Sequence, residues 1–323
     1  MAKFKVFVTE PIPEIEFGLR ILEGAEVRTR GEFVSPLPAE DLKDVDGVVA
    51  GDAKITRSAI EGAGRLKVIG RFGVGVDSVD LEACTERGVV VFNVPGLNAQ
   101  SVAEHAIGMI VAVAKKFVAV DKLVRSGRWR EKAGYMGFEL QGKTLGIVGL
   151  GNIGSKVAEI AKAFGMKVLA YDPYAPAERA EKLGVAMVDL RSLLKDSDVV
   201  SLHAPLTEET KGLIGEGELK LMKPTAILVN TARGGMVDEK ALYKALKEGW
   251  IAGAGVDVLE GEPVESHPLF ELENALLTPH MASWTVEAFR RMALKACEGI
   301  LKVMRGEVPD NVVNPGALAK KRF

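Results

Sequence analysis

The stretch Thr144–Gly154 constrains the fold of this chain more than any other segment. It begins with a short apolar run that is typical of a buried strand, and Gly149, Gly151 and Gly154 then follow in G-x-G-x-x-G spacing. A helical pattern continues over Asn152–Phe164. In a dinucleotide site the glycines allow a tight turn, a close approach of the pyrophosphate and close packing of helix on strand, while the helix N-terminus offers N–H groups to the phosphates. The strand–loop–helix order therefore predicts a dinucleotide-binding α/β domain.

An acidic residue downstream narrows the choice of cofactor. The strand pattern Lys167–Tyr171 ends at Asp172, about twenty residues after the glycines, where such folds place an acid. A carboxylate there accepts hydrogen bonds from both ribose hydroxyls and repels a 2′-phosphate. The nearest following arginine, Arg179, is seven residues further on. We therefore expect NAD rather than NADP, the alternative being that Asp172 only caps a turn before Pro173.

A second glycine motif overlaps the first but has the wrong surroundings. Gly137–Thr144 matches G-x-x-x-x-G-K-[ST], the phosphate loop of ATP- and GTP-binding proteins. That loop has to follow a strand and lead into a helix, so that its N–H groups surround the phosphates. Here a loop precedes the motif and a strand follows it. We therefore interpret Gly142-Lys143 as the turn before that strand.

Composition excludes several classes of protein. A chain of 323 residues, with 47% hydrophobic and 27% charged residues, is typical of a globular protein of two domains. A formal charge of −2 gives no reason to expect nucleic acid as a partner. Cys84 and Cys297 have neither metal-ligand nor redox spacing, so no disulfide framework and no metal site is expected. The first residues are strand-like rather than leader-like, and no apolar run reaches the roughly 18 residues of a membrane span. We therefore expect a soluble, cytoplasmic protein.

Strand and helix patterns alternate along the chain, which predicts parallel sheets covered by helices. Five strand patterns lie before residue 98, namely Lys3–Thr9, Ala25–Thr29, Gly47–Ala50, Lys67–Arg71 and Val89–Asn93. Six more lie from Thr144 onward, namely Thr144–Leu150, Val168–Tyr171, Val199–His203, Ala226–Asn230, Ile251–Val258 and Ala275–Leu277. A final helix, about Thr285–Arg305, is long enough to leave the second domain, and the tail Asn311–Pro315 could return to the first. The predicted fold class is α/β, with two Rossmann-like parallel-sheet domains. A NAD-binding domain, residues 99–286, is inserted into a discontinuous domain of residues 1–98 and 287–323.

The segment between the two domains has an unusually apolar helical pattern. It runs from about Ala99 to Ser126 and carries apolar residues on most faces. A helix of this kind is buried in its own protein or against a second subunit. Trp129 and Tyr135 follow in the next loop. We therefore expect a homodimer with the 99–140 segment in its interface.

Three ionisable residues at strand ends or in loops are candidates for catalysis. Hydride exchange with a nicotinamide needs one group that moves a proton at the substrate oxygen and another that holds an anionic substrate. Arg233 precedes two glycines after a strand, where a guanidinium could bind a carboxylate in bidentate fashion or could equally be a surface charge. His280 follows a strand that ends in proline, and imidazole is suited to proton transfer near neutral pH. Glu262 could pair with His280 and stabilise its imidazolium form, although taken singly it is typical of an exposed loop acid.

The other three histidines are expected to play supporting roles. His267 precedes a proline in a polar loop and His105 lies in the long helical pattern, so both are interpreted as structural. His203 ends a strand in His203-Ala-Pro-Leu-Thr207. We expect it to line the wall of the cofactor site rather than to act as an acid or base.

Taken together, these motifs resemble those of the D-isomer-specific 2-hydroxyacid dehydrogenases over essentially the whole chain. The matching signatures are Gly149–Gly154, His203–Thr207, Asn230–Gly235, Gly255–Val258, Gly261–Pro263 and Thr278–His280. The resemblance implies NAD as cofactor, a flavodoxin-like substrate domain and a catalytic triad of Arg233, Glu262 and His280, of which Arg233 and His280 contact the substrate. It also implies a set of NAD contacts, namely Gly149, Gly151, Asn152, Ile153, Gly154, Asp172, His203, Ala204, Pro205, Thr231, Ala232, Asp257 and Ser283. The loop Phe72–Val76 is similar to the family's substrate-carboxylate loop, with backbone N–H groups from Val74 and Gly75.

The resemblance leaves the substrate and one alternative function open. The segment Lys67–Pro95, together with Val102–His105, is most similar to the phosphoglycerate dehydrogenase branch. However, these 323 residues contain no counterpart of the serine-sensing domain of long members, and Ala50-Gly51-Asp52 stands where phosphoglycerate-type members have an arginine that meets the substrate phosphate. Asp52 would repel a phosphate, so glyoxylate, hydroxypyruvate or a related small 2-oxo acid is weighed equally with phosphohydroxypyruvate. Relatives of the same fold serve as NAD-sensing transcriptional corepressors, and turnover of NADH distinguishes an enzyme from such a sensor.

Overall fold

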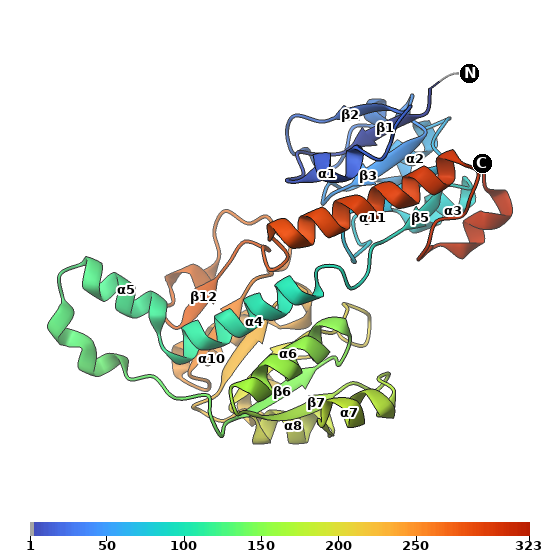
Figure 1. The fold of residues 1–323 in the computed structure, drawn as a ribbon. Helices are drawn as coiled ribbons and strands as arrows, with labels where there is room; N and C mark the ends of the chain where they lie inside the picture. The colour runs from blue at the N-terminus through green and yellow to red at the C-terminus, as the bar shows by residue number, and fades with distance from the viewer. Residues whose placement is uncertain (1–2) are drawn as a thin grey trace. The chain divides into compact units, whose positions relative to one another are not determined.

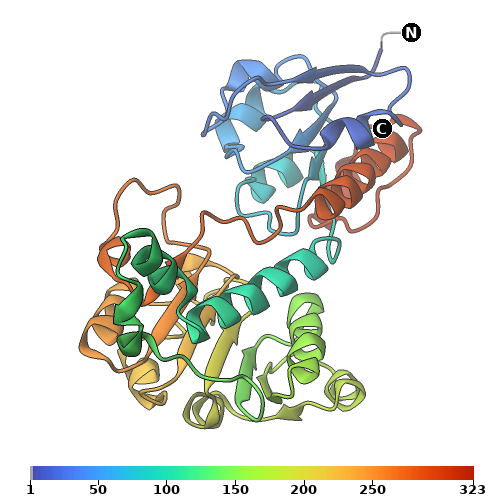
Figure 2. The ribbon, with the colours of Figure 1, turned by 60° about the vertical axis from the view of Figure 1, so that its left-hand side comes forward.

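The structure, a computed structural model, describes residues 3–323 and divides into two compact units (Figures 1 and 2). Unit 1 contains the residues up to Asn98 together with Trp284–Phe323, and unit 2 contains Ala99–Ser283. Each unit is built on one parallel sheet with helices packed on it. The predicted α/β fold class with two parallel-sheet domains is therefore confirmed. The chain returns to unit 1 at Trp284, slightly before the predicted residue 287.

Unit 1 contains five short strands that all run parallel, in the order β2-β1-β3-β4-β5. This order is that of flavodoxin-like sheets. The central strand β3 is buried at every position, as expected for a parallel strand covered on both faces. The strands are β1 (Lys5–Val8), β2 (Glu26–Thr29), β3 (Gly47–Ala50), β4 (Val68–Arg71) and β5 (Val90–Phe92), and the helical elements between them are α1 (Ile15–Leu19), η1 (Ala39–Leu42), α2 (Arg57–Gly62) and α3 (Leu81–Glu86).

The long helix α11 (Val286–Met304) completes the core of unit 1 although it lies far away in the sequence. Thr285 caps its N-terminus by accepting a hydrogen bond from a backbone N–H. The packing against α1 is close, because a Cβ on Gly18 would lie 2.3 Å from the carbonyl oxygen of Ala293. The buried face of α11 shares one apolar cluster with the sheet; its members include Phe289, Met292, Ala296, Ile300, Val6, Val8 and Val68.

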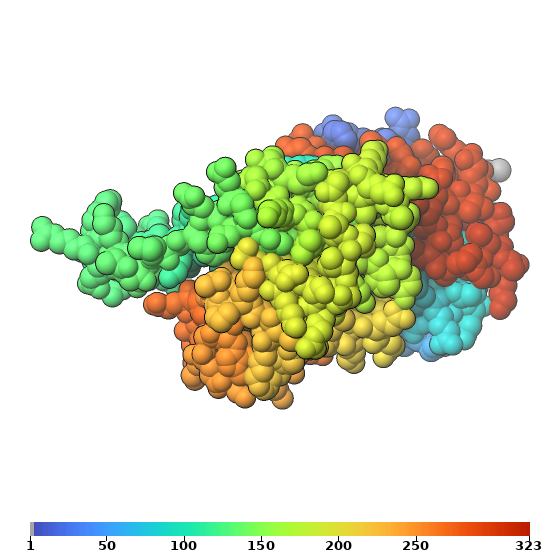
Figure 3. Space-filling model, turned by 90° about the horizontal axis from the view of Figure 1, so that it is seen from below, coloured from blue at the N-terminus to red at the C-terminus, as the bar shows by residue number. Residues whose placement is uncertain are grey.

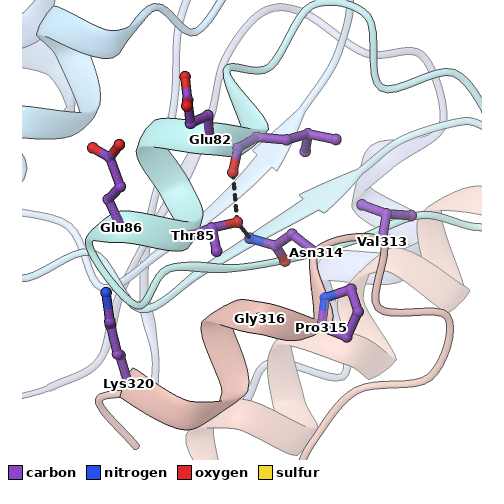
Figure 4. Close-up of a pocket in the computed structure, with 9 residues that line it drawn as sticks. Glu82, Thr85, Glu86, Val313, Asn314, Pro315, Gly316 and Lys320 are labelled. Carbon is purple, nitrogen blue, oxygen red and sulfur yellow. Dashed lines mark hydrogen bonds between the residues drawn. The ribbon is translucent and has the colours of Figure 1, made fainter.

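The tail after α11 returns to the sheet of unit 1, as the sequence suggested. Asn314 is buried and accepts a hydrogen bond from the Val91 N–H (2.8 Å), while its Nδ2 donates to the Val89 carbonyl (2.9 Å) and to Oγ1 of Thr85 (3.3 Å). One amide side chain thus ties the tail to both β5 and α3. A pocket lies beside this contact (Figure 4), between α3 and the 3₁₀ helix η5 (Pro315–Lys320). It contains no residue of the predicted site.

Unit 2 contains seven parallel strands in the order β12-β11-β10-β9-β6-β7-β8. If β6 is counted as the first strand of this unit, β6 to β11 follow the 3-2-1-4-5-6 order of dinucleotide-binding sheets. β12 adds one more strand beside β11. The strands are β6 (Thr144–Val148), β7 (Lys167–Tyr171), β8 (Ala186–Met187), β9 (Val199–Leu202), β10 (Ile227–Asn230), β11 (Gly253–Val256) and β12 (Ala275–Leu277). The helices among them are α6 (Asn152–Ala163), α7 (Ala177–Leu183), α8 (Leu190–Asp196), α9 (Glu216–Leu221) and α10 (Glu239–Glu248). All predicted strands are present, and only the two-residue edge strand β8 was missed.

The prediction of a single helix over 99–126 is wrong. The segment forms two helices, α4 (Ala99–Ala114) and α5 (Phe117–Arg125), separated at Lys116, which adopts the left-handed conformation with φ 55°. α4 is buried in unit 2, as its apolar pattern predicted. α5 and the following 3₁₀ helix η2 (Trp129–Tyr135) project from the rest of unit 2, where their green atoms stand apart in Figure 3. In residues 3–323 no helix is both long enough and apolar enough to span a membrane.

Candidate active site

The glycine loop of unit 2 has the geometry that a dinucleotide requires. Gly149 adopts φ 93°, and a Cβ there would lie 2.6 Å from the backbone nitrogen of Ala204. A Cβ on Gly154 would lie 2.1 Å from the carbonyl oxygen of Gly149. A Cβ on Gly151, by contrast, would meet no heavy atom within 4 Å, so the loop has open space at this point for a ligand to approach. Helix α6 begins at Asn152, so the N–H groups of its first turn, including that of Ile153, are oriented toward that space.

Asp172 lies directly beside the glycine loop. Its carboxylate accepts hydrogen bonds from the N–H groups of Leu150 (2.8 Å) and Tyr174 (2.9 Å). An ionised carboxylate has room for about four hydrogen bonds, so it can still accept from ribose hydroxyls. Arg179, which sequence reasoning set aside as too distant, donates from Nη1 to the Leu150 carbonyl (2.9 Å). A guanidinium and a carboxylate therefore both reach the same end of the loop.

Two buried polar atoms near the ends of β9 and β10 have no hydrogen-bond partner within residues 3–323. They are Nδ1 of His203 and Oγ1 of Thr231. The other ring nitrogen of His203 lies 2.9 Å from Oγ of Ser201, and burial lowers the pKa of His203 to about 3. The ring is therefore neutral at pH 7, in line with its predicted place on a wall rather than in proton transfer. Together with Gly151, these unpaired atoms fit a bound dinucleotide, for which Ala204, Pro205 and Ala232 would provide neighbouring surface.

The turn that carries Arg233 is fixed by its neighbours. The Asn230 side chain donates to the Arg233 carbonyl (2.8 Å) and accepts from the Ala232 N–H (3.0 Å). The Arg233 guanidinium donates to the Ala232 carbonyl (2.7 Å). Gly234 is required here because its Cβ would lie 2.2 Å from the Leu259 carbonyl carbon. The Arg233 turn is thus packed against the segment that leads to Glu262.

His280 and Glu262 form a direct pair, as predicted. Nδ1 of His280 is hydrogen-bonded to Oε1 of Glu262, and Oε2 of Glu262 accepts from the Leu259 N–H (3.3 Å). The His280 side chain is 43% exposed, so solvent-borne ligands can reach it. His280 adopts φ 51° and donates its N–H to the Asp257 carbonyl (2.7 Å). The carboxylate of Glu262 therefore fixes the orientation of the imidazole ring through Nδ1.

Asp257 is buried beneath the loop that carries His280, and both of its carboxylate oxygens accept hydrogen bonds from that loop. Oδ1 accepts from the Met281 N–H (2.9 Å) and from the Thr278 hydroxyl, and Oδ2 accepts from the Ala282 N–H (3.0 Å). Nε2 of His105 lies 3.1 Å from the same hydroxyl. His105 was predicted to be structural, and its link to this loop has no sequence signal, because it comes from packing between α4 and β12. The predicted NAD contacts of Asp257 and of Ser283, which ends the loop, remain predictions.

The loop Phe72–Val76 of unit 1 follows β4 at the carboxyl end of that sheet. Val74 is 39% exposed, and Gly73 adopts φ 145°, a value that strains any residue with a side chain. Asp52, which is expected to repel a substrate phosphate, has its carboxylate paired with the Nη2 group of Arg71, which offsets part of its charge. Whether Asp52 repels a phosphate stays a prediction.

The chain matches a family model described as D-isomer specific 2-hydroxyacid dehydrogenase, NAD binding domain, over residues 107–282. It is 46% identical to D-3-phosphoglycerate dehydrogenase of Methanocaldococcus jannaschii, with 96% of this chain and 59% of that relative aligned. It is 44% identical to glyoxylate reductase of Thermococcus litoralis, with 98% of each chain aligned. The solved structure of D-lactate dehydrogenase from Aquifex aeolicus, complexed with NAD and lactic acid, superposes with a TM-score of 0.84 at 30% identity and covers 98% of both chains.

This chain belongs to the D-isomer specific 2-hydroxyacid dehydrogenase family. The predictions of an NAD-dependent oxidoreductase and of NAD as cofactor are confirmed. The corepressor alternative is not favoured, because the relatives are named dehydrogenases and reductases. Within residues 3–323, no group of three or more His, Cys, Asp or Glu side chains is arranged to hold a metal ion.

Proposed function

We propose that the protein transfers a hydride reversibly between NAD and a small D-2-hydroxy acid. Arg233 would hold the carboxylate and the C2 oxygen of the substrate, and Nε2 of His280 would donate the proton to that oxygen when a 2-oxo acid is reduced. Glu262 would keep the imidazole oriented and stabilise its protonated form. The N–H groups of Val74 and Gly75 would bind the substrate carboxylate. NAD, when bound, supplies or accepts the hydride. The observation that carries this proposal is the direct His280–Glu262 hydrogen bond in the unit that contains the glycine loop.

The substrate is proposed to be a short 2-oxo acid such as glyoxylate or hydroxypyruvate, with phosphohydroxypyruvate as the competing candidate. The Arg71–Asp52 ion pair supports the shorter acids, because it leaves no unpaired cation at this position for a phosphate. The relatives named above include both a glyoxylate reductase and a D-3-phosphoglycerate dehydrogenase. Their names therefore do not decide between the two classes of substrate.

A panel assay tests the proposed function. NADH consumption is followed by absorbance with glyoxylate, hydroxypyruvate, phosphohydroxypyruvate and pyruvate in turn. We expect turnover with at least one acid, and a higher kcat/KM for hydroxypyruvate than for its phosphorylated form. Tight NADH binding without turnover of any acid would contradict the proposed enzymatic function and support a role in NADH sensing.

We further propose that the protein is a cytoplasmic homodimer that associates through the 99–140 segment. Five large apolar residues in and around α5 and η2 are at least 36% exposed, namely Phe117, Val118, Val124, Trp129 and Met136. A surface of this kind, projecting from its own unit, is typical of a subunit interface. Both cysteines are free and buried, which fits a reducing compartment.

The dimer proposal predicts the effect of charge on this surface. Wild-type protein should elute in light-scattering chromatography with twice the chain mass of 34.6 kDa. The double variant Phe117→Asp/Trp129→Asp should elute with the mass of one chain, because two buried carboxylates without partners would oppose association. Phe33→Asp, at an aromatic residue of unit 1 that is 49% exposed, is the matched control and should leave the mass unchanged. A double variant that stays dimeric would rule out this segment as the interface.

A further inference from the structure

Arg71, the last residue of β4, holds the loop Phe72–Val76 by its carbonyl groups. Nη1 donates to the Phe72 carbonyl (2.7 Å) and to the Ala50 carbonyl (3.2 Å), and Nε donates to the Gly75 carbonyl (2.9 Å). Nη2 is bonded to Asp52. The Arg71 side chain is only 12% exposed and all three of its nitrogens are engaged within unit 1. It therefore acts as a fixed brace for the loop rather than as a cation available to a ligand.

The segment after β5 binds the carbonyl groups of Gly73 and Val74, which lie between the two loop carbonyl groups that Arg71 binds. The Val94 N–H donates to the Gly73 carbonyl (3.0 Å), and Nδ2 of Asn93 donates to the Val74 carbonyl (2.7 Å). Four consecutive carbonyl groups, those of residues 72 to 75, are thus hydrogen-bonded to Arg71, Asn93 or Val94. All of these contacts lie within unit 1.

This arrangement fixes the direction of the N–H groups as well. In a trans peptide the N–H points opposite to the carbonyl of the same peptide group. The contact of Val94 with the Gly73 carbonyl therefore orients the N–H of Val74, and the contact of Asn93 with the Val74 carbonyl orients the N–H of Gly75. Within residues 3–323 neither N–H donates to a protein acceptor. Successive unpaired N–H groups that point the same way form a binding site for anions.

We propose that Asn93 and Arg71 are positioning residues that orient the Val74 and Gly75 N–H groups toward the carboxylate of the substrate, an inference that rests on the proposed function. Asn93 acts on the peptide group that presents the Gly75 N–H. Arg71 holds the peptide groups on either side and, because Asp52 offsets its charge, contributes geometry rather than attraction. The site selects the planar carboxylate that every 2-oxo acid of the panel shares. It does not select the tail by which those acids differ.

Substitution of Asn93 tests this proposal. In Asn93→Ala we expect the KM for the preferred 2-oxo acid to rise roughly tenfold, while kcat stays within about twofold of wild type. The reason is that the substrate carboxylate is bound equally in the ground state and in the transition state, so both lose the same contact. The Kd of oxalate for the NADH complex, measured by nucleotide fluorescence, should rise by the same factor, while the Kd of NADH stays unchanged. Asn93→Asp, which is isosteric but places a carboxylate against the Val74 carbonyl, should weaken oxalate binding further. Arg71→Lys keeps the charge, cannot reach the three carbonyl groups at once, and should raise the same two constants.

The control is Asn274→Ala, which removes an amide that donates to the Leu246 carbonyl (3.1 Å) in unit 2 and should match wild type in every constant. An unchanged oxalate Kd in Asn93→Ala, or an equal rise in Asn274→Ala, overturns the positioning role while wild-type turnover leaves the proposed function standing. If wild type reduces no 2-oxo acid, the proposed function fails, and the positioning role is then judged from the oxalate Kd alone. Weaker oxalate binding in Asn93→Ala than in wild type then still supports the positioning role, and absence of oxalate binding by wild type overturns it.

Discussion

Replacement of His280 with alanine is expected to lower kcat by roughly 10²–10⁴-fold, the usual contribution of a general acid or base. The affinity for NADH should stay at the wild-type value, because the glycine loop and Asp172 are built without His280. The physical reason is that Nδ1 of His280 is bonded to Glu262, which orients the imidazole that we propose as the proton donor and acceptor. Steady-state kinetics with the preferred acid, together with NADH titration by fluorescence, measures both quantities.

Two further variants separate proton transfer from simple loss of structure. His280→Gln can still bond to Glu262 but cannot carry a proton, and it should be as inactive as the alanine variant. His267→Gln is the matched control, since His267 also pairs with a glutamate of unit 2, Glu239, at 3.0 Å. Its kcat should stay within about threefold of wild type, as for residues without contact to the reacting atoms. Turnover by His280→Ala close to that of wild type would remove His280 from the mechanism.

Replacement of Asp172 with glycine is expected to shift the ratio of kcat/KM for NADPH over NADH by about 10²-fold, because juxtaposed like charges cost several kcal/mol and 1.4 kcal/mol is tenfold. Two effects combine in this variant. The carboxylate that repels the 2′-phosphate is lost, and the Arg179 guanidinium, which already reaches the Leu150 carbonyl, then has an anion to bind. Kinetics with saturating acid and varied nucleotide measure the ratio.

The Arg179 contribution is isolated by a double-mutant cycle. Arg179→Ala alone should change NADH use little, whereas Asp172→Gly/Arg179→Ala should lose much of the gain with NADPH. Asp172→Asn removes the charge but retains one acceptor for the Leu150 and Tyr174 N–H groups, so it shows whether the shift comes from charge or from disturbance of the loop. A ratio that is the same in Asp172→Gly and wild type would mean that Asp172 does not contact the ribose.

The sequence predicted those features of the fold that depend on local pattern. Buried parallel strands such as β3 and β10 are continuous apolar runs, and the glycine spacing after β6 can be identified from one strand–helix unit. The break between α4 and α5 could not be predicted in this way. Neither glycine nor proline marks Lys116, and the apolar pattern continues on both sides of it. The edge strand β8 was missed because two exposed residues carry no periodicity.

In the candidate site, too, the features that depend on local sequence could be predicted and those that depend on tertiary packing could not. His280, Glu262 and Arg233 could be proposed as catalytic candidates because each follows a strand end or lies in a glycine-rich loop, and the structure places His280 and Glu262 in contact. Interactions between side chains far apart in the sequence were not foreseeable. The pairing of Arg71 with Asp52 and the approach of Arg179 to the glycine loop arise only when separate elements pack together.

The late position of α11 has a consequence for the synthesis of this chain. The apolar face of the unit 1 sheet that α11 covers is complete once β5 has been made, but its cover follows only after all of Ala99–Ser283. At about 5–20 residues per second, that interval lasts on the order of ten to forty seconds. During this interval unit 2 is the first part of the nascent chain that can complete its hydrophobic core. Residues such as Val6, Val8 and Val68 of unit 1 meanwhile stay exposed to water or to a chaperone. The part of the protein that is made first is therefore the part that finishes folding last.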